Sequence, residues 1–334
     1  METIETGDPE RWDAALRAVG AHDFYHLCGY HRIAEARGEG RALLLTGAAG
    51  AGRFALPLLV RPIPASDRCD AISAYGYPGL LTAGAVDPDA LADALRTALA
   101  GRGVVTVFGR LHPILSDASV LAKLGTVRDE GPTVSIDLSL GADGARAAYR
   151  SNHRRDLRKL AATGHVCGEE RGPAAIADFV RVYVDTMRRV GAGDAYLFDE
   201  AYVEALLALP GLALLLCCRD GSVRAGAIVS ATGGVAQYHL GGTIGAALAD
   251  APMKLVFDIA RGWATERGAR LLHLGGGLGA REDALFHFKA GFGTVRHRFS
   301  TWRWIVEPEA AIALGGAEAG ADGFFPAYRS PSRR

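Results

Sequence analysis

A lysine flanked by aromatic residues is the first feature of this sequence that could do chemistry. Lys289 lies in Phe288-Lys-Ala-Gly-Phe292, shortly after the acidic pair Glu282-Asp283, which is typical of a helix N-terminus. In partly apolar surroundings a lysine can neutralise a phosphate or stabilise a developing oxyanion. We therefore take Lys289 as a candidate catalytic residue and Phe288 as a candidate substrate contact. The alternative is structural, because the helix dipole also stabilises a cation in the last turn of a helix.

Two glycine-containing segments follow strands that we expect to be neighbours in one sheet. They are Tyr238-His-Leu-Gly-Gly-Thr243 and His273-Leu-Gly-Gly-Gly277. Binding sites in open α/β sheets form beyond the carboxyl ends of strands, where glycines let a ligand approach backbone N–H groups. His239 and His273 are candidate catalytic bases near neutral pH, with a hydrogen-bonded structural role as the alternative. The candidate substrate contacts in these segments are Tyr238, Thr243, Gly275 and Gly276.

Cationic side chains recur at helical spacing in the segment 150–159. They are Arg150, Arg154, Arg155, Arg158 and Lys159. On a helix most of them would form one continuous cationic face, and Asp156 is the only acidic residue nearby. Such a face could bind phosphates through charge-assisted hydrogen bonds. An ordinary solvated helix face is the alternative.

The order of helical and strand patterns predicts an α/β fold made of two similar halves. Each half shows helices, a three-strand meander, a helix, a strand, a helix and a strand. In the first half we expect helices at 8–19, 25–36 and 87–100 and strands at 41–46, 54–60, 71–81 and 104–108. In the second half, Asp220-Gly221 and Gly233-Gly234 predict hairpin turns, and one long helix is expected at 143–162.

These patterns predict an N-terminal half at 1–140, a C-terminal half at 141–312 that carries the donor site, and a flexible C-terminal tail at 313–334, which is rich in Gly, Ala, Ser and Pro. The aromatic turn Tyr75-Gly-Tyr77-Pro-Gly79 lies in the first half. Tyr75 and Tyr77 are further candidate substrate contacts, and sealing a sheet edge is their alternative role.

Composition narrows the class of protein. The chain has 334 residues, of which 49% are hydrophobic and 22% charged, so it can bury a core without metals or disulfides. The net charge is zero, so any nucleic-acid contact requires a local basic patch. The five cysteines have no metal-ligand spacing, and we expect reduced thiols and no metal site. We find no apolar signal region and no apolar stretch of the ~20 residues that a membrane span needs, which predicts a cytoplasmic protein.

Four segments resemble the Fem-type (FemABX) peptidyltransferase family, whose members have two acetyltransferase-like (GNAT) domains. They are Asn152-His-Arg-Arg-Asp-Leu-Arg-Lys159, Tyr238-His-Leu-Gly-Gly-Thr243, Phe288-Lys-Ala-Gly-Phe292 and Tyr75-Gly-Tyr-Pro-Gly79. The resemblance implies two tandem GNAT mixed sheets flanked by helices, and transfer of an aminoacyl group from aminoacyl-tRNA to an amine. It also implies that Lys289 corresponds to the catalytic lysine of the family.

The sequence departs from the larger family members in two respects. No coiled-coil arm interrupts the second half, so the chain resembles the compact members. The expected helix at 25–36 has no lysine where the peptidoglycan-type members hold a nucleotide diphosphate. The second departure favours a small natural product or peptide precursor as the amine-bearing acceptor.

Three functions remain open at the level of the sequence. The first is an aminoacyl-tRNA-dependent aminoacyltransferase that forms an amide bond, with the charged tRNA acceptor end as partner and no resident cofactor. The second is an acyl-CoA-dependent N-acetyltransferase that uses acetyl-CoA. The segment 243–254 disfavours the acetyl-CoA-dependent function. An acetyltransferase would bind the coenzyme A diphosphate there with a glycine-rich loop, whereas this segment has bulky side chains at the key positions and contains Pro252. The third is a scaffold that keeps the fold without catalysis.

Overall fold

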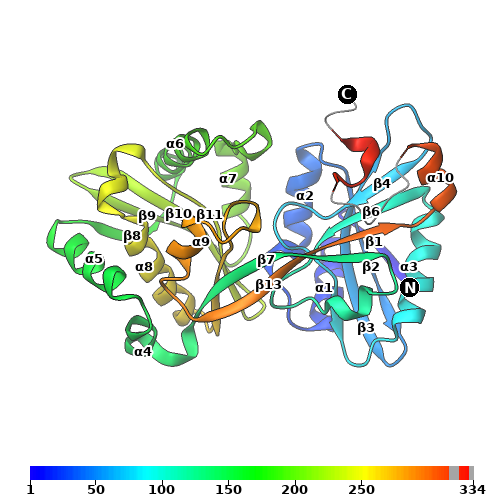
Figure 1. The fold of residues 1–334 in the computed structure, drawn as a ribbon, viewed down its shortest axis with the longest axis horizontal. Helices are drawn as coiled ribbons and strands as arrows, with labels where there is room; N and C mark the ends of the chain where they lie inside the picture. The colour runs from blue at the N-terminus through cyan, green and yellow to red at the C-terminus, as the bar shows by residue number, and fades with distance from the viewer. Residues whose placement is uncertain (316–322, 331–334) are drawn as a thin grey trace. The chain divides into compact units, whose positions relative to one another are not determined.

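The computed structural model describes residues 1–315 and 323–330. The chain forms two compact units, and each is described by itself. Unit 1 contains residues 1–131 together with the described residues from 298 on, and unit 2 contains residues 132–297. Two long strands, β7 (Thr126–Asp137) and β13 (Val295–Ile305), carry the chain from one unit to the other. Figure 1 shows both in the ribbon.

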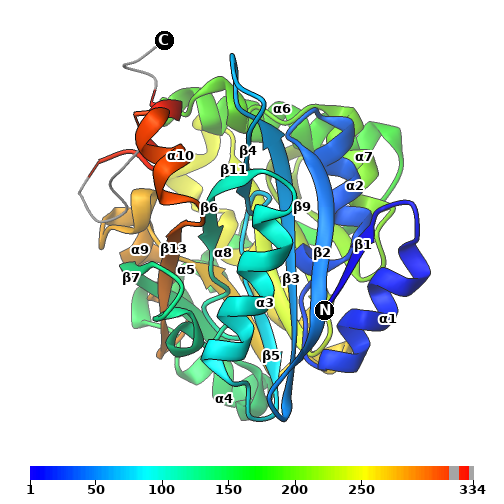
Figure 2. The ribbon, with the colours of Figure 1, turned by 90° about the vertical axis from the view of Figure 1, so that its right-hand side faces the viewer.

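The sheet of unit 1 is mostly antiparallel and contains one parallel pair of strands. Its strand order is β1 (Glu2–Glu5), β2 (Arg41–Ala49), β3 (Gly52–Pro62), β4 (Cys69–Ile72), β6 (Val104–Arg110) and β13, while β5 (Leu81–Ala83) pairs with β3. Strands β4 and β6 are parallel, and the other pairs are antiparallel. Helices α1 (Pro9–Val19) and α2 (Cys28–Ala36) lie on one face, and α3 (Pro88–Ala100) lies on the other (Figure 2).

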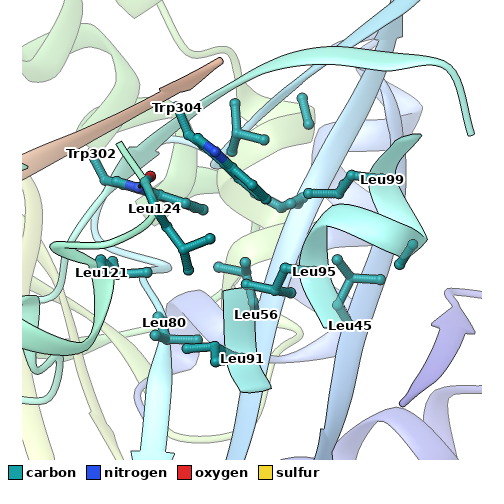
Figure 3. Packing of buried hydrophobic residues seen from close by; sticks show 14 of the residues in the cluster. Leu45, Leu56, Leu80, Leu91, Leu95, Leu99, Leu121, Leu124, Trp302 and Trp304 are labelled. Carbon is teal, nitrogen blue, oxygen red and sulfur yellow. Dashed lines mark hydrogen bonds between the residues drawn. The ribbon is translucent and has the colours of Figure 1, made fainter. Parts of the chain in front are cut away.

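The core of unit 1 explains why the last strand of the chain belongs to it. Leu91, Leu95 and Leu99 form one apolar stripe along α3, which begins where the Asp87 side chain caps the helix. Trp302 and Trp304 of β13 belong to the same buried cluster, as Figure 3 shows. Because this cluster buries both indole rings, β13 completes the sheet of unit 1, which corrects the predicted C-terminal half at 141–312.

The tail predicted as flexible at 313–334 lies partly outside the described residues, which omit 316–322 and 331–334. Its described part packs on unit 1. Arg329 forms an ion pair with the buried Asp70 at 2.7 Å, and the Tyr328 hydroxyl lies 2.6 Å from Thr106 Oγ1. Helix α10 (Pro308–Ala313), which the sequence analysis did not predict, precedes it.

Unit 2 repeats this topology. Its strand order is β7, β12 (Leu271–Gly275), β11 (Val235–Thr243), β10 (Ser222–Thr232), β9 (Leu212–Arg219) and β8 (Val166–Glu170). Strands β11 and β12 are parallel, and the other pairs are antiparallel. In each unit, therefore, a meander of three strands is followed by a helix and a parallel strand. The last strand of each sheet comes from the segment that joins the two units.

Two helical layers cover the sheet of unit 2. Helix α8 (Met253–Glu266) packs on the face that carries Ala225 and Ala227, and α6 (Pro173–Arg189) packs on the opposite face, where Gly226 leaves room for Phe179. The remaining helices are α4 (Gly141–Ala147), α5 (Ser151–Ala162), α7 (Glu200–Leu207) and α9 (Ala284–Lys289). They are labelled in Figure 1.

Several expected elements differ in the structure. The long helix expected at 143–162 is two helices, α4 and α5, because the backbone leaves the helical region at Arg150. The strand expected at 71–81 is interrupted by the turn that contains Tyr75 and Tyr77, which separates β4 from β5. The helix expected at 25–36 begins with a 3-10 turn at Phe24–His26, and α2 starts only at Cys28.

Candidate functional site

The candidate site lies where the parallel strands β11 and β12 part. The two strands pair at Ala236–Leu272 and Gln237–His273. Beyond this pairing β11 continues to Thr243, whereas β12 ends at Gly275. Lys289 connects the two sides, because its Nζ donates a 2.7 Å hydrogen bond to the Gly276 carbonyl and lies 5.5 Å from the centroid of the Tyr238 ring. The structure thus brings three of the predicted residues together.

A tight turn after β12 places α9 at this point. Gly275 has a positive φ of 76°, which a residue with a side chain rarely adopts. A Cβ on Gly277 would come within 2.1 Å of the Arg281 carbonyl oxygen. The Asp283 side chain then caps α9 by accepting hydrogen bonds from the Phe286 and Leu278 backbone N–H groups, at 2.9 and 3.0 Å. The backbone geometry of this turn therefore explains why Gly275 and Gly277 are glycines, and a role of Gly275 and Gly276 in binding substrate stays a prediction.

Burial dominates the electrostatics of Lys289. The side chain is 7% exposed, and this desolvation lowers its pKa from 10.5 to about 8, while the charge of Asp283 acts in the opposite direction. Among the residues that the structure describes, Lys289 forms no ion pair. Its partners are a carbonyl oxygen and an aromatic face, both of which attract a cation without neutralising it. The amine is thus poised between its charged and neutral forms near physiological pH.

Aromatic side chains pack around Tyr238 and Phe288 on the α8 side of the sheet. The Phe257 ring packs edge-on against Tyr238 with centroids 4.9 Å apart, and lies 5.8 Å from the ring of Phe288. Phe288 also contacts Phe292, at 5.6 Å. Phe288 therefore packs against the hydrophobic core of unit 2, and a role in binding substrate stays a prediction.

The two candidate histidines are held in the sheet. His273 is fully buried, and its Nδ1 lies 2.8 Å from Gln237 Oε1 on the paired strand. Burial lowers the pKa of His239 to about 3, so this imidazole is neutral and weakly basic at pH 7. The described hydrogen bond of His273 links it to β11 rather than to Lys289. A catalytic role of either histidine stays a prediction.

The start of α5 docks on the end of α9, a contact that the sequence analysis missed. The buried His153 lies 2.9 Å through Nε2 from the Phe288 carbonyl oxygen and packs against the Phe292 ring with centroids 4.5 Å apart. A Cβ on Gly291 would come within 2.2 Å of this ring nitrogen. The Arg150 backbone N–H donates to the Gly291 carbonyl at 2.9 Å. The only sequence signal was that both segments belong to the family resemblance.

The basic residues of 150–159 do not form one continuous helical face. Arg150 precedes α5, and its guanidinium donates to the His287 carbonyl at 3.1 Å. Arg154 donates to the Ala147 and Tyr149 carbonyls at the end of α4, which is a structural use. The remaining cations are exposed along α5: Arg155 beside Asp156 at 3.2 Å, Lys159 at 3.9 Å from Asp250, and Arg158.

A second cation lies beside Arg150. The charge of Arg150 contributes to lowering the pKa of Arg296, although burial contributes more. Arg150 is also the N-cap residue of α5, so the positive end of the helix dipole lies nearby, and among the described residues no side chain caps it. This end of unit 2 therefore combines two guanidinium groups with a helix N-terminus, which is an arrangement that attracts anions.

Side chains of α6 fix the end of β11, where an acetyltransferase would bind the coenzyme A diphosphate. Thr243 N–H donates to Thr186 Oγ1 at 3.0 Å, and the Thr243 carbonyl accepts from Arg189 at 3.0 Å. The Asp185 carboxylate accepts from the Gly245 N–H at 2.9 Å. The Thr243 and Gly245 N–H groups, which could otherwise bind phosphates, thus donate to side chains of α6, and the acceptor of the Gly245 N–H is a carboxylate.

Tyr75 and Tyr77 lie in unit 1 and stabilise its own turn. The Tyr75 carbonyl accepts a 2.8 Å hydrogen bond from the Tyr30 hydroxyl. Tyr77 packs edge-on against Tyr25, with centroids 5.7 Å apart, and burial raises the pKa of its phenol. Gly76 has a φ of 91°, and a Cβ on it would come within 2.1 Å of the Tyr25 ring. These contacts are structural, and a role in binding substrate stays a prediction.

Comparisons with known proteins identify the fold. The family model described as an acetyltransferase (GNAT) domain matches residues 147–289, which include β11, β12 and Lys289. The structure is similar to the crystal structure of FemX, with a TM-score of 0.67 and 15% sequence identity over 90% of this chain and 97% of that one. The protein has the fold of the Fem-type tandem GNAT proteins. The resemblance inferred from the four sequence segments is therefore confirmed at the level of the fold.

Two further solved structures are similar in fold to this chain. One is the C-terminal domain of a putative lysylphosphatidylglycerol synthetase from Agrobacterium fabrum, with a TM-score of 0.58 and 16% identity over 94% of this chain and 99% of that one. The other is L-PGS from Bacillus licheniformis, with a TM-score of 0.58 and 15% identity over 96% of this chain and all of that one. No curated protein matches the sequence. Together these findings support a GNAT-fold transferase.

Two searches of the described residues concern a membrane and a metal. In residues 1–315 and 323–330, every helix is too short or too polar to cross a bilayer. In the same residues, no three His, Cys, Asp or Glu side chains are grouped so that they could bind a metal ion.

Proposed function

We propose that this protein is an aminoacyltransferase that moves an aminoacyl group from charged tRNA to the amine of a small natural product or peptide precursor. The observation that carries the proposal is the buried Lys289 at the parting of β11 and β12, held by the Gly276 carbonyl and the Tyr238 ring. A cation kept in such a place at a cost in stability is an expected feature of a site where negative charge develops.

The proposed reaction is the aminolysis of an ester. The neutral amine nitrogen attacks the ester carbonyl carbon, so a C–N bond forms while the bond between that carbon and the ribose oxygen breaks. One proton of the amine passes to the departing ribose hydroxyl. The Lys289 ammonium donates a hydrogen bond to the oxyanion of the tetrahedral intermediate. Holding ester and amine together supplies much of the rate, so the reaction needs no resident cofactor.

The anion-attracting end of unit 2 supports tRNA as the acyl carrier. Arg150, Arg296 and the uncapped α5 N-terminus can meet phosphates, while Arg155, Arg158 and Lys159 extend the cationic surface along α5. Since charged tRNA is the donor, we also propose that the protein acts in the cytoplasm.

The contacts at the end of β11 favour tRNA over coenzyme A. In the acetyltransferase alternative, backbone N–H groups at this point would bind the diphosphate. Here the Asp185 carboxylate, which is paired with Arg189 at 2.6 Å, accepts the Gly245 N–H, so a diphosphate would have to displace this carboxylate to reach that donor. The acetyltransferase description of the matched family keeps acetyl-CoA as the second candidate donor.

The test compares donors on one set of acceptors. Purified protein is incubated with labelled aminoacyl-tRNAs or labelled acetyl-CoA and a panel of small amines and peptides, and products are detected by mass. We expect amide products from charged tRNA and none from acetyl-CoA. Label from acetyl-CoA alone would replace the proposal with the acetyltransferase. No product from any donor, by a protein that binds charged tRNA, would leave the scaffold function.

The pH dependence tests the role of Lys289. If its ammonium stabilises the oxyanion, the single-turnover rate at saturating acceptor falls as the pH rises through about 8. Lys289→Arg should remove this fall, because a guanidinium keeps its proton. A rate that rises through pH 8 and loses this rise in Lys289→Arg would instead identify Lys289 as a base.

A further inference from the structure

We propose that His153 is the positioning residue for Lys289, acting from α5 through the Phe288 carbonyl. This inference rests on the proposed function, since it gives His153 a part in the same reaction. His153 does not touch the reacting groups, and its contact reaches the backbone immediately before the lysine.

Helix α9 cannot hold Lys289 in place alone. It has 6 residues, and an isolated helix of that length is unstable in water. Its last carbonyl groups need partners that the helix does not supply. Two of these partners come from the start of α5: Arg150 donates to the His287 carbonyl, and His153 faces the Phe288 carbonyl. The end of α9 is therefore fixed by tertiary contacts.

Three residues of the α9 region, Phe288, Gly291 and Phe292, confine the His153 ring where α5 contacts α9. Its ring packs against Phe288 and Phe292, with centroids 5.5 and 4.5 Å away. Gly291 leaves the space that its Nε2 occupies, since a Cβ there would come within 2.2 Å. The side chain is 3% exposed. A ring confined in this way fixes the carbonyl that it contacts.

The protonation state of His153 suits this role. Nε2 faces a carbonyl oxygen, so it carries the hydrogen and donates, while Nδ1 is buried with no partner among the described residues. Burial lowers the pKa of His153, and the Lys254 and Arg150 charges lower it further, whereas the Phe288 hydrogen bond and Asp156 act in the opposite direction. The ring is thus a neutral donor, and its contact with α9 does not change with pH near neutrality.

The lysine content of the chain permits a direct test that does not depend on activity. The sequence contains only four lysines, Lys123, Lys159, Lys254 and Lys289. Protein labelled with ¹³C and ¹⁵N at lysine gives four side-chain signals, and Lys289→Met identifies the one from Lys289. Titration of this signal reports the burial of Lys289. Asp283 is the charged group that acts on it besides the desolvation itself.

The variants separate positioning from general stability. His153→Leu keeps an apolar side chain but removes the donor, and His153→Gln restores an N–H close to the original Nε2. His165→Leu is the matched control, since His165 is a buried histidine just beyond the other end of α5 and contacts Thr163. Gly291→Ala displaces the His153 ring from the opposite side, and it carries the test if His153→Leu does not fold.

The expected result is a coupled change. In His153→Leu the pKa of Lys289 should rise by about one unit, because a displaced lysine regains water. The turnover number should fall about ten- to a hundredfold with little change in KM, since such a misplacement affects the chemical step. His153→Gln should recover most of both, and His165→Leu should change neither.

Two results would overturn the proposal. One is an unchanged Lys289 pKa in folded His153→Leu or Gly291→Ala. The other is an equal rise of that pKa in His165→Leu, which would indicate general loosening of α5. If no aminoacyl transfer is found in the wild type, the proposed function fails, whereas the titration still decides whether His153 positions Lys289.

Discussion

The two units differ in the side chains that lie beyond their pair of parallel strands, β4 and β6 in unit 1 and β11 and β12 in unit 2. In unit 1 the space beyond the parallel strands β4 and β6 contains the buried Asp23 and His112, whose carboxylate oxygen and Nε2 lie 3.1 Å apart. His112 Nδ1 accepts from the Ile114 and Leu115 N–H groups, both at 3.1 Å. His26 Nε2 lies 3.1 Å from the Gly79 carbonyl and fixes the aromatic turn. These polar atoms satisfy one another.

Unit 2 has the same strand arrangement, but its buried Lys289 has no counterion among the residues that the structure describes. Beyond β11 and β12 lies Lys289, whose described partners are the Gly276 carbonyl and the Tyr238 ring. The pKa of Lys289 is lowered because its burial costs stability, whereas the buried Asp23 and His112 are hydrogen-bonded to each other. Under the proposed function, the strand junction of unit 1 supports the fold and the junction of unit 2 carries the chemistry.

The largest expected effect is the loss of activity on removing the buried cation. Lys289→Met should lower the turnover number roughly 10²- to 10³-fold, as expected when one donor to an oxyanion is lost. Single-turnover assays with the identified donor and acceptor measure it, with Lys254→Met as the lysine control, since Lys254 pairs with Asp156. Turnover of Lys289→Met within twofold of the wild type would mean that the two junctions do not differ in function.

The next largest effect is a loss of stability when the buried Asp23 of unit 1 is replaced. Asp23→Ala leaves the His112 Nε2–H and the Phe24 N–H without their acceptor, at a cost of about 1–3 kcal/mol for each buried donor. Urea unfolding measures this loss, and Asp67→Ala is the control, because that side chain is 93% exposed. The Lys289 pKa should stay at about 8 in the folded variant. A shifted value would show that the two junctions are coupled.

A smaller effect is expected on the stability of Lys289→Met. The pKa of Lys289 is about 8 in the folded protein against 10.5 in the unfolded chain, so the unfolded state binds more protons between these values and wild-type stability rises with pH in this window. At pH 7 the substitution should therefore stabilise the protein by ~1–3 kcal/mol, after allowing for the lost hydrogen bond. This gain should vanish by about pH 10.5 in thermal unfolding measured against pH. A gain that does not change with pH would argue against a buried cation.

The smallest effect separates two arginines of α5. Arg154→Ala should destabilise the protein by about 1 kcal/mol, since Arg154 donates to two carbonyls at the end of α4. Arg158→Ala should leave stability within about 0.5 kcal/mol but weaken tRNA binding a few-fold and lower its salt dependence by about one ion. Filter binding at several salt concentrations checks this. Equal losses of binding in both variants would restore the continuous cationic face expected from sequence.

Sequence reasoning found the elements that local patterns encode. The hairpin turns at Asp220-Gly221 and Gly233-Gly234 are confirmed, because these residues have the positive φ angles that such turns need. The meander and the parallel step follow from the alternation of strands and a helix. The break at Arg150 was missed, since the segment 143–162 contains no proline that would mark it. It is stabilised by the Gly291 carbonyl, far away in the chain.

Local patterns also identified part of the candidate site. Lys289, Tyr238 and Gly276 stand in short segments whose residue types suggest chemistry, and the structure brings them together. His153 was not selected, although it stands in one of those segments, because nothing in its neighbours shows that it contacts Phe288.

The sequence by itself determined the alternation of helices and strands, the turns and the resemblance to Fem-type proteins, because these depend on residues close together in the chain. Only the tertiary structure decided which unit the last strand joins, which arginines support a helix, and how deeply Lys289 is buried. Several of these properties depend on contacts between residues more than a hundred positions apart, such as Trp302 with Leu124 and His153 with Phe288, and all of them depend on how the elements pack, which no local pattern records.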